Sequence, residues 1–268
     1  MREPQKRRAS LHQCRRTGPS RVPTYTEEGI VLRRADWSEY DRIITVLTRG
    51  RGKVALVARG VRRPQSRLAS HLDLFTHVDL VLASGRGTMD VITGARARSR
   101  LEANFELERA TTAAVCAEVL DALVDPGVAD PGLFDLALLA FTDCGAAPEP
   151  VKGLLWFLIR FAVRSGYAPL VHECAACGVL LEADDGGFSG RLGGVVCPSC
   201  ASSGHFLSLS LRSLKVLRVI CRDEREVFGR VALPRQEQLQ LLAAATDLLG
   251  YQGEHHFRSV PVLEGLLQ

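Results

Sequence analysis

Two Cys-x-x-Cys pairs constrain the fold of this 268-residue chain more than any other feature of its sequence. Cys174 and Cys177 form the first pair, Cys197 and Cys200 form the second, and 19 residues separate them. Each pair can form a turn whose two sulfurs converge, and two such turns complete a tetrahedral zinc site. Because four thiolates leave no position for an activated water, the sequence predicts one structural Zn²⁺ ion bound by these four cysteines.

The residues around the cysteines predict a zinc ribbon within an insert spanning 170–206. We expect the glycine pairs Gly186-Gly187 and Gly193-Gly194 to form its hairpin turns. His172 and His205 bracket the cysteines, either as outer support for the metal site or as neighbours without a role. Four free thiols or a redox-active pair are the alternative to a metal site.

Charge divides the chain into two unlike halves. Residues 1–100 contain 21 basic and 9 acidic residues, a balance of +12, whereas residues 101–268 contain 13 basic and 21 acidic residues, a balance of −8. Such asymmetry predicts a polyanionic partner for the basic half. Residues 1–24 are basic and have no apolar core, so we expect a disordered extension or a start placed too far upstream, and not a secretory signal; an Arg-rich transit peptide is the alternative.

No apolar run approaches the roughly 20 residues that a membrane-spanning helix needs. With neither a span nor a secretion signal, we expect a reducing, cytoplasmic setting in which the cysteines form no disulfides.

Residues 25–100 read as five short strands, because β-branched and apolar runs alternate with glycine-rich turns. We expect these strands at 28–34, 41–48, 53–59, 75–83 and 88–97, with turns such as 49–52 and 84–87 between them. Five strands in about 75 residues fit a small antiparallel barrel, for which the OB-fold is the commonest architecture. The strand count alone leaves an SH3-like barrel open.

After residue 100 the apolar residues recur at helical spacing, so residues 101–268 predict a mainly helical domain. We expect helices at 107–124, 133–141, 151–165, 211–221 and 235–249, with Ser210 as an N-cap and Gly166 ending the third. The predicted fold class is therefore α+β: a five-stranded OB-fold barrel over 25–100, then a helical domain with a zinc-ribbon-like insert that carries the four cysteines.

Basic residues gather on the predicted barrel, and no acidic residue lies between Lys53 and Asp73. Arginines spread over several loops of one barrel can follow a phosphate backbone, whereas an ordinary solvated surface, the alternative, carries interspersed acids. The predicted DNA-binding residues are Arg33, Arg34, Arg49, Arg51, Lys53, Arg59, Arg62, Arg63, Arg67, Arg96 and Arg98. Trp37 and Tyr40 stand in a polar turn, where they can stack on bases.

The sequence contains no pattern of a catalytic centre. Gly50-Arg-Gly-Lys53 resembles a phosphate-binding loop only in part, because Leu47 and Val54 stand where a Walker A motif needs glycine and Ser or Thr. No histidine has metal-hydrolase spacing and no carboxylate pair stands out, so we predict a protein that is not an enzyme.

Several segments together are similar to one family. Glu28-Gly-Ile-Val-Leu-Arg33, Ser38-Glu-Tyr-Asp-Arg42 and the basic loop 58–67 resemble the N-terminal domain of the RecO family of DNA repair proteins. Ser165-Gly-Tyr-Ala-Pro-Leu170, the paired cysteines and the Gly193-Gly-Val-Val run before Cys197 resemble that family's passage through its zinc site. The resemblance runs from about residue 25 to the C-terminus, and residues 1–24 have no counterpart in it.

The resemblance implies an OB-fold, a helical domain and a role in recombinational repair. RecO proteins bind single- and double-stranded DNA, anneal complementary strands, and work with RecR to load RecA onto DNA coated with single-stranded DNA-binding protein, whose acidic tail they contact. It also implies that the basic loop 59–67 faces DNA, that the protein is associated with the nucleoid, and that the zinc is structural, since some relatives lack its ligands.

The acidic helical domain is the expected place for protein partners. An acidic tail needs a local basic patch there, and Lys215, Arg218 and Arg222, flanked by Arg212 and Arg225, are spaced to share much of one helical face. A solvated helix face is the alternative. At the level of function, the alternatives are a zinc-ribbon nucleic-acid regulator without mediator activity and, from another class, a nuclease.

Overall fold

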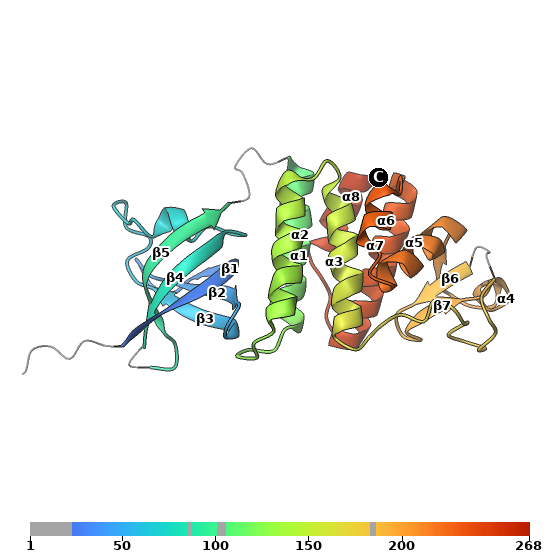
Figure 1. The fold of residues 1–268 in the computed structure, drawn as a ribbon, viewed down its shortest axis with the longest axis horizontal. Coiled ribbons are helices and arrows are strands. Elements are labelled where there is room, and N and C mark those ends of the chain that lie inside the picture. The colour runs from blue at the N-terminus through green and yellow to red at the C-terminus, as the bar shows by residue number, and fades with distance from the viewer. Residues whose placement is uncertain (1–22, 85–86, 101–105, 183–185) are drawn as a thin grey trace, which may run out of the picture.

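The computed structural model describes residues 23–84, 87–100, 106–182 and 186–268. A β-barrel lies at one end, a bundle of helices in the middle, and a small sheet bearing the cysteines at the other end (Figure 1). The protein is thus α+β, as predicted. The extension expected at 1–24 lies outside the described residues up to position 22, and part of the expected turn at 84–87 does as well.

The barrel is closed and has the strand order β1-β2-β3-β5-β4, with β4 returning to β1. Its strands are β1 (Thr24–Asp36), β2 (Arg42–Thr48), β3 (Gly52–Ala58), β4 (His77–Ala83) and β5 (Val91–Ser99). From β3 the chain crosses to β4, which pairs with β1, and only then returns to place β5 between β3 and β4. This is the Greek-key arrangement of an OB-fold, which decides against the SH3-like alternative. The expectation of a wholly antiparallel barrel is wrong at one place: β3 and β5 pair in parallel, through Val57 and Val91.

Alternating side chains of β1 and β2 pack into two different hydrophobic cores, one inside the barrel and one shared with the helices. Val31 and Val46 point into the barrel, whereas Ile30, Leu32 and Leu47 pack with the helices. This follows from the two-residue period of a strand, which sends successive side chains to opposite faces. One face of the barrel is therefore covered by the helical part.

Eight α-helices and one 3₁₀ helix lie in the described residues. They are η1 (Ala69–His71), α1 (Leu107–Leu123), α2 (Pro131–Ala146), α3 (Pro150–Arg164), α4 (Pro198–Ser202), α5 (Leu211–Cys221), α6 (Arg225–Arg230), α7 (Arg235–Gly253) and α8 (Val260–Leu267). The five predicted helices are confirmed as α1, α2, α3, α5 and α7. The Ser210 cap is confirmed too, because its hydroxyl accepts the backbone N–H of Ser213 at 3.2 Å.

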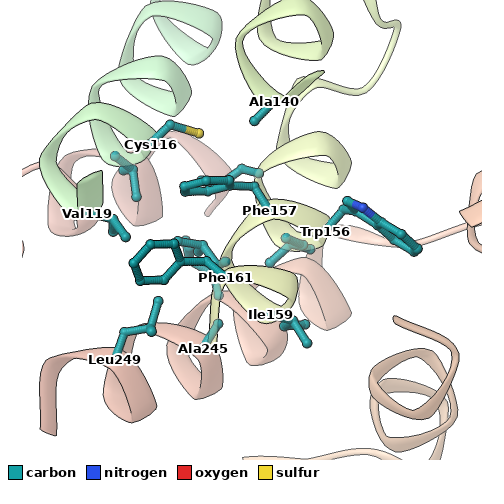
Figure 2. Close-up of a cluster of buried hydrophobic side chains, with 14 of the residues drawn as sticks. Cys116, Val119, Ala140, Trp156, Phe157, Ile159, Phe161, Ala245 and Leu249 are labelled. Carbon is teal, nitrogen blue, oxygen red and sulfur yellow. The ribbon is translucent and has the colours of Figure 1, made fainter. Parts of the chain in front are cut away.

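Helix α3 is the centre of the helical part, and most of its residues are buried on every side. Figure 2 shows its Phe157 and Phe161 beside Val119 of α1 and Leu249 of α7. A helix with so many buried residues must be enclosed by others, and α1, α2, α5 and α7 enclose this one. It ends at Arg164 with Ser165 as its C-cap, and Gly166 follows with a φ of +86°, close to the end that the sequence predicted.

The turn between β2 and β3 joins the barrel to the helical part. Gly52 has a φ of +65° and lies against the backbone of Val128 in the loop between α1 and α2. The carbonyl of Lys53 accepts the N–H of Gly127 at 3.0 Å. Within the four described ranges, no helix combines the length and apolarity that crossing a bilayer requires.

Candidate metal centre and nucleic-acid interface

The cysteine insert is built on a three-stranded sheet with the order β7-β6-β8, formed by β6 (Gly186–Ser189), β7 (Gly194–Val196) and β8 (Leu207–Leu209). Of the pair Gly193-Gly194 predicted as a turn, Gly193 lies in the β6–β7 turn with a φ of +75°, whereas Gly194 is the first residue of β7. The prediction of a turn at Gly186-Gly187 is wrong, because both lie within β6. Gly186 passes so close to the carbonyl of Val196 that a side chain has no room there.

All four cysteine sulfurs lie within 4.8 Å of one another, and no other group in the described residues has this kind of metal-ligand geometry. At a Zn–S distance of about 2.3 Å, the sulfurs of a tetrahedral site lie about 3.8 Å apart. The sulfurs of Cys177 and Cys197 are 3.8 Å apart, so this edge already has the length that zinc requires. Neither His172 nor His205 belongs to the cluster.

Local backbone geometry brings each pair of sulfurs together. In the first pair, the carbonyl of Cys174 accepts the N–H of Gly178 at 2.8 Å, and Gly178 takes a φ of +76° to close the turn. In the second pair, Cys197 is the N-cap of α4, so Cys200 follows on the first helical turn. The N–H of Cys197 also donates to the sulfur of Cys174 at 3.3 Å, which links the two pairs.

Hydrogen bonding to sulfur favours the thiolate form that binds metal. Burial acts to raise the pKa of Cys174, but N–H groups of Cys197, Cys177 and Ala176 hold it down to about 6. The neighbouring thiols Cys197 and Cys177 raise the pKa of Cys200. Because a thiol must lose its proton to bind a metal ion, the lowered pKa of Cys174 favours cation binding, whereas Cys200 gives up its proton only when the cation is bound.

The insert rests on α5 and α7 through two polar contacts. Arg218 of α5 donates to the carbonyls of Val171 at 2.8 Å and Leu181 at 3.3 Å. The N–H of Gly190 donates to Asp247 of α7 at 2.6 Å. Arg218 therefore has a structural contact that its sequence position did not reveal.

The other basic residues predicted on α5 and after it have unlike surroundings. Lys215 is exposed on α5. Arg222 pairs with Glu224 at 2.9 Å, and Arg225 reaches Asp143 of α2 at 2.7 Å. Of the three predicted partner-binding residues, Lys215 is thus exposed with no ion pair among the described residues, Arg222 is in an exposed local pair, and Arg218 holds the insert.

Three of the predicted DNA-binding residues lie against the helical part. Arg33 pairs with Asp121 of α1 at 2.6 Å. Lys53 donates to the backbone carbonyl of Asp121, and the side chain of Lys53 is only 12% exposed. Burial lowers the pKa of Lys53, an effect that Asp121 opposes.

Arg49 is the third of these residues and is held between the two parts of the molecule. Its guanidinium contacts Glu28 of β1 at 2.8 Å and Asp135 of α2 at 2.7 Å, and lies 4.5 Å from the ring centroid of Phe134. Hydrogen bonds to Asp135 and Glu28 raise the pKa of Arg49, which keeps it charged. No local pattern in the sequence marks these acidic partners.

A second group is paired with acids of the barrel itself. Arg34 contacts Asp73 at 2.7 Å and Arg51 contacts Asp90 at 2.8 Å. Arg98 lies 2.8 Å from Glu28 and 2.7 Å from Asp79. Less than half of each of these arginine side chains is exposed. A DNA phosphate can therefore reach them, but it has to compete with the acidic side chain that each one already contacts.

A third group is exposed and lies mainly on the loop between β3 and η1. Among the described residues, Arg59, Arg63 and Arg67 form no ion pair with an acidic side chain, and Arg62 has a longer pair with Asp36 at 3.3 Å. Arg96 on β5 forms no close ion pair either, but it lies opposite Asp79 of β4, the acid that Arg98 contacts. The loop 59–67 therefore carries the barrel's least neutralised positive charge.

Two family models together match nearly the whole chain. The model described as Recombination protein O N terminal matches residues 22–101, and the one described as Recombination protein O C terminal matches residues 104–261. Among curated proteins, the chain is 41% identical over 247 residues to a protein of Nocardioides sp., covering 90% of this chain and 99% of that one.

Two further relatives give the same result. The chain is 36% identical to a protein of Frankia casuarinae, over 91% of this chain and 99% of that one. It is 34% identical to a protein of Roseiflexus sp., over 91% of this chain and 86% of that one. All three relatives are named DNA repair protein RecO.

Proposed function

Because the chain belongs to the RecO family of DNA repair proteins, we propose that it acts as a recombination mediator that binds single- and double-stranded DNA and anneals complementary strands. The observation that carries this proposal is the exposed loop 59–67, whose arginines have few acidic neighbours. Two complementary strands repel each other through their phosphates. A surface that neutralises both lowers that barrier without any catalytic side chain, so the activity is not enzymatic.

In this proposal the three groups of basic residues differ in how much they contribute to DNA binding. Arg59, Arg62, Arg63, Arg67 and Arg96 make the first contacts with phosphates, since little opposes them. Arg34, Arg51 and Arg98 contribute when phosphates displace their acidic partners. Arg33, Arg49 and Lys53 contribute least, because the helical part already holds them.

The cysteine cluster fits one structural Zn²⁺, held by Cys174, Cys177, Cys197 and Cys200. Bound there, the ion cross-links the two turns of a segment that has little core of its own. The cluster is at the far end from the barrel, so the metal shapes the helical domain rather than the DNA surface (Figure 1).

We further propose a division of labour between a DNA-binding domain at 25–100 and a partner-binding domain at 101–268. RecR and single-stranded DNA-binding protein are the expected partners, and RecA is reached indirectly through them at the nucleoid. Lys215 and Arg222 are the proposed contacts for an acidic tail. Arg218 stands between them, but its test is confounded because it also holds the insert.

The salt dependence of DNA binding tests the proposal. We expect an Arg62→Ala, Arg63→Ala double variant to weaken binding to all sequences alike. The slope of log affinity against log salt should become shallower by about two for duplex DNA. An Arg212→Ala, Arg230→Ala variant, which removes two exposed arginines outside the barrel, is the matched control. An unchanged slope in the barrel variant would place the DNA surface elsewhere.

A further inference from the structure

The turn between β1 and β2 exposes two large aromatic side chains. Trp37 is 61% exposed and Tyr40 is 41% exposed, although both lie next to a well-packed barrel. The other tryptophan, Trp156, is only 3% exposed in the helical core. Neither exposed ring contributes to a hydrophobic cluster, so the fold itself does not account for them.

Hydrogen bonds hold this turn in one conformation. The N–H of Trp37 donates to the carbonyl of Asp41 at 3.0 Å, and the N–H of Asp41 donates to the hydroxyl of Ser38 at 3.3 Å. A ring on such a turn loses little conformational freedom when a ligand stacks on it. The site is therefore pre-organised.

The same turn is joined to the basic loop 59–67. The carboxylate of Asp41 accepts the N–H of Gly60 at 2.7 Å, and the carbonyl of Tyr40 accepts the N–H of Arg62 at 3.0 Å. The guanidinium carbon of Arg63 lies 5.1 Å from the ring centroid of Tyr40. Aromatic rings and phosphate-binding arginines thus belong to one connected surface.

A hollow of about 560 Å³ lies on that surface. It is lined by Tyr40, Gly60, Arg63, Pro64, Gln65 and Ser66. Its wall offers an aromatic ring, a planar cation and a side-chain amide. These are the groups that stack on an unpaired base and hydrogen-bond to its edge.

We propose that the 37–41 turn and the loop 59–67 form a stacking site for unpaired bases, with Trp37 and Tyr40 as its rings. The inference rests on the proposed DNA-binding function and adds a preference to it. Arginines bind the backbone of either form, whereas rings reach only the bases of a single strand. When two bound strands pair, their bases turn inward and leave the rings, so the site favours release of the duplex.

Tryptophan fluorescence tests this directly, since Trp37 is exposed and Trp156 is buried. The full-length protein is titrated with an oligo-dT, with an abasic strand of the same length and charge, and with a hairpin-closed duplex. We expect oligo-dT to quench the emission, and the abasic strand and the duplex to leave it nearly unchanged.

Substitution gives a second readout. Stacking contributes about 1–3 kcal/mol per base, so Trp37→Leu or Tyr40→Leu should each weaken oligo-dT binding by about 5-fold or more. Duplex affinity should stay within about twofold. Tyr251→Leu, which removes an exposed tyrosine from α7, is the control and should change neither affinity.

The outcomes separate the two proposals. Equal affinity for oligo-dT and abasic strands, with no selective quenching, overturns the stacking site and leaves DNA binding intact. Failure of all three ligands to bind overturns the proposed function itself. A variant that does not fold leaves the decision to the wild-type comparison of oligo-dT with the abasic strand.

Discussion

Gly52 lies so close to the backbone of Val128 that replacing it with alanine, which adds one methyl group, should lower the stability of the fold strongly. A Cβ added there would stand 2.5 Å from the carbonyl carbon of Val128 and closer still to its oxygen. The obstacle is backbone, so the loop between α1 and α2 has to move away from the barrel. The φ of +65° adds a second penalty, because side chains with L chirality rarely adopt it.

Two nearby glycines allow the two penalties to be separated. Gly127 has a φ of +77° but nothing within 4 Å of an added Cβ. The left-handed conformation costs about 1–2 kcal/mol, and alanine offsets about 0.4–1 kcal/mol by restricting the unfolded chain. Gly127→Ala should therefore cost about 1 kcal/mol. Gly50 would meet only the flexible end of Glu27, so Gly50→Ala should stay within about 0.5 kcal/mol.

Gly52→Ala combines the conformational penalty with overpacking, which typically costs about 1–3 kcal/mol. The expected total is about 2–4 kcal/mol. Equilibrium urea unfolding of the three variants measures these differences as shifts in midpoint. A Gly52→Ala variant no less stable than Gly127→Ala would refute the close contact between barrel and helices at this turn.

Three further predictions concern the metal, pH and the core. Purified protein should contain about one Zn²⁺, measured by elemental analysis; Cys197→Ser should abolish it, whereas His205→Ala should not, and an equal loss in both would contradict the four-cysteine site. Burial acts to raise the pKa of Glu118, but hydrogen bonds such as that from the N–H of Ser259 at 2.9 Å hold it below 4.5. This stabilising contribution is fully present well above the unfolded-state pKa of a glutamate and is lost as pH falls through the lower folded-state pKa, so Glu118→Gln should flatten the acid limb of an unfolding curve; an unaltered limb would exclude this role. Phe157→Ala should cost about 3–5 kcal/mol in urea, and a loss below 1 kcal/mol would contradict the packing around α3.

The sequence predicted the regular elements well, because strand and helix periods are local signals. It missed α8, a short helix containing Pro261 and Gly265. That helix depends on tertiary contacts: Leu263 is fully buried, and Glu118 of α1 accepts the N–H of Ser259 at its start. Neither contact can be predicted from the intrinsic helix propensity of these residues.

Glycine patterns were informative where the backbone needs a positive φ and misleading elsewhere. Gly193 lies in a turn as expected, whereas Gly186 is needed for a close approach between strands. Both requirements select glycine, so the sequence does not distinguish them. The parallel pairing of β3 with β5 could not be predicted either, because the sequence of a strand does not show which strand it pairs with.

The candidate DNA surface was the least predictable part. Arg33 and Asp121 are 88 residues apart, and Arg49 and Asp135 are 86 residues apart. The sequence shows basic residues in excess but not which acids fold back onto them. The cysteine cluster was easier to predict, because each Cys-x-x-Cys turn is local and only their convergence is tertiary.

The most direct test of the proposed function is strand annealing. Complementary oligonucleotides coated with single-stranded DNA-binding protein are mixed, and duplex formation is followed with and without this protein. We expect the wild type to accelerate duplex formation markedly and the Arg62→Ala, Arg63→Ala variant to accelerate it little. If the wild type binds both strands but does not accelerate duplex formation at any concentration, this protein is not an annealing mediator.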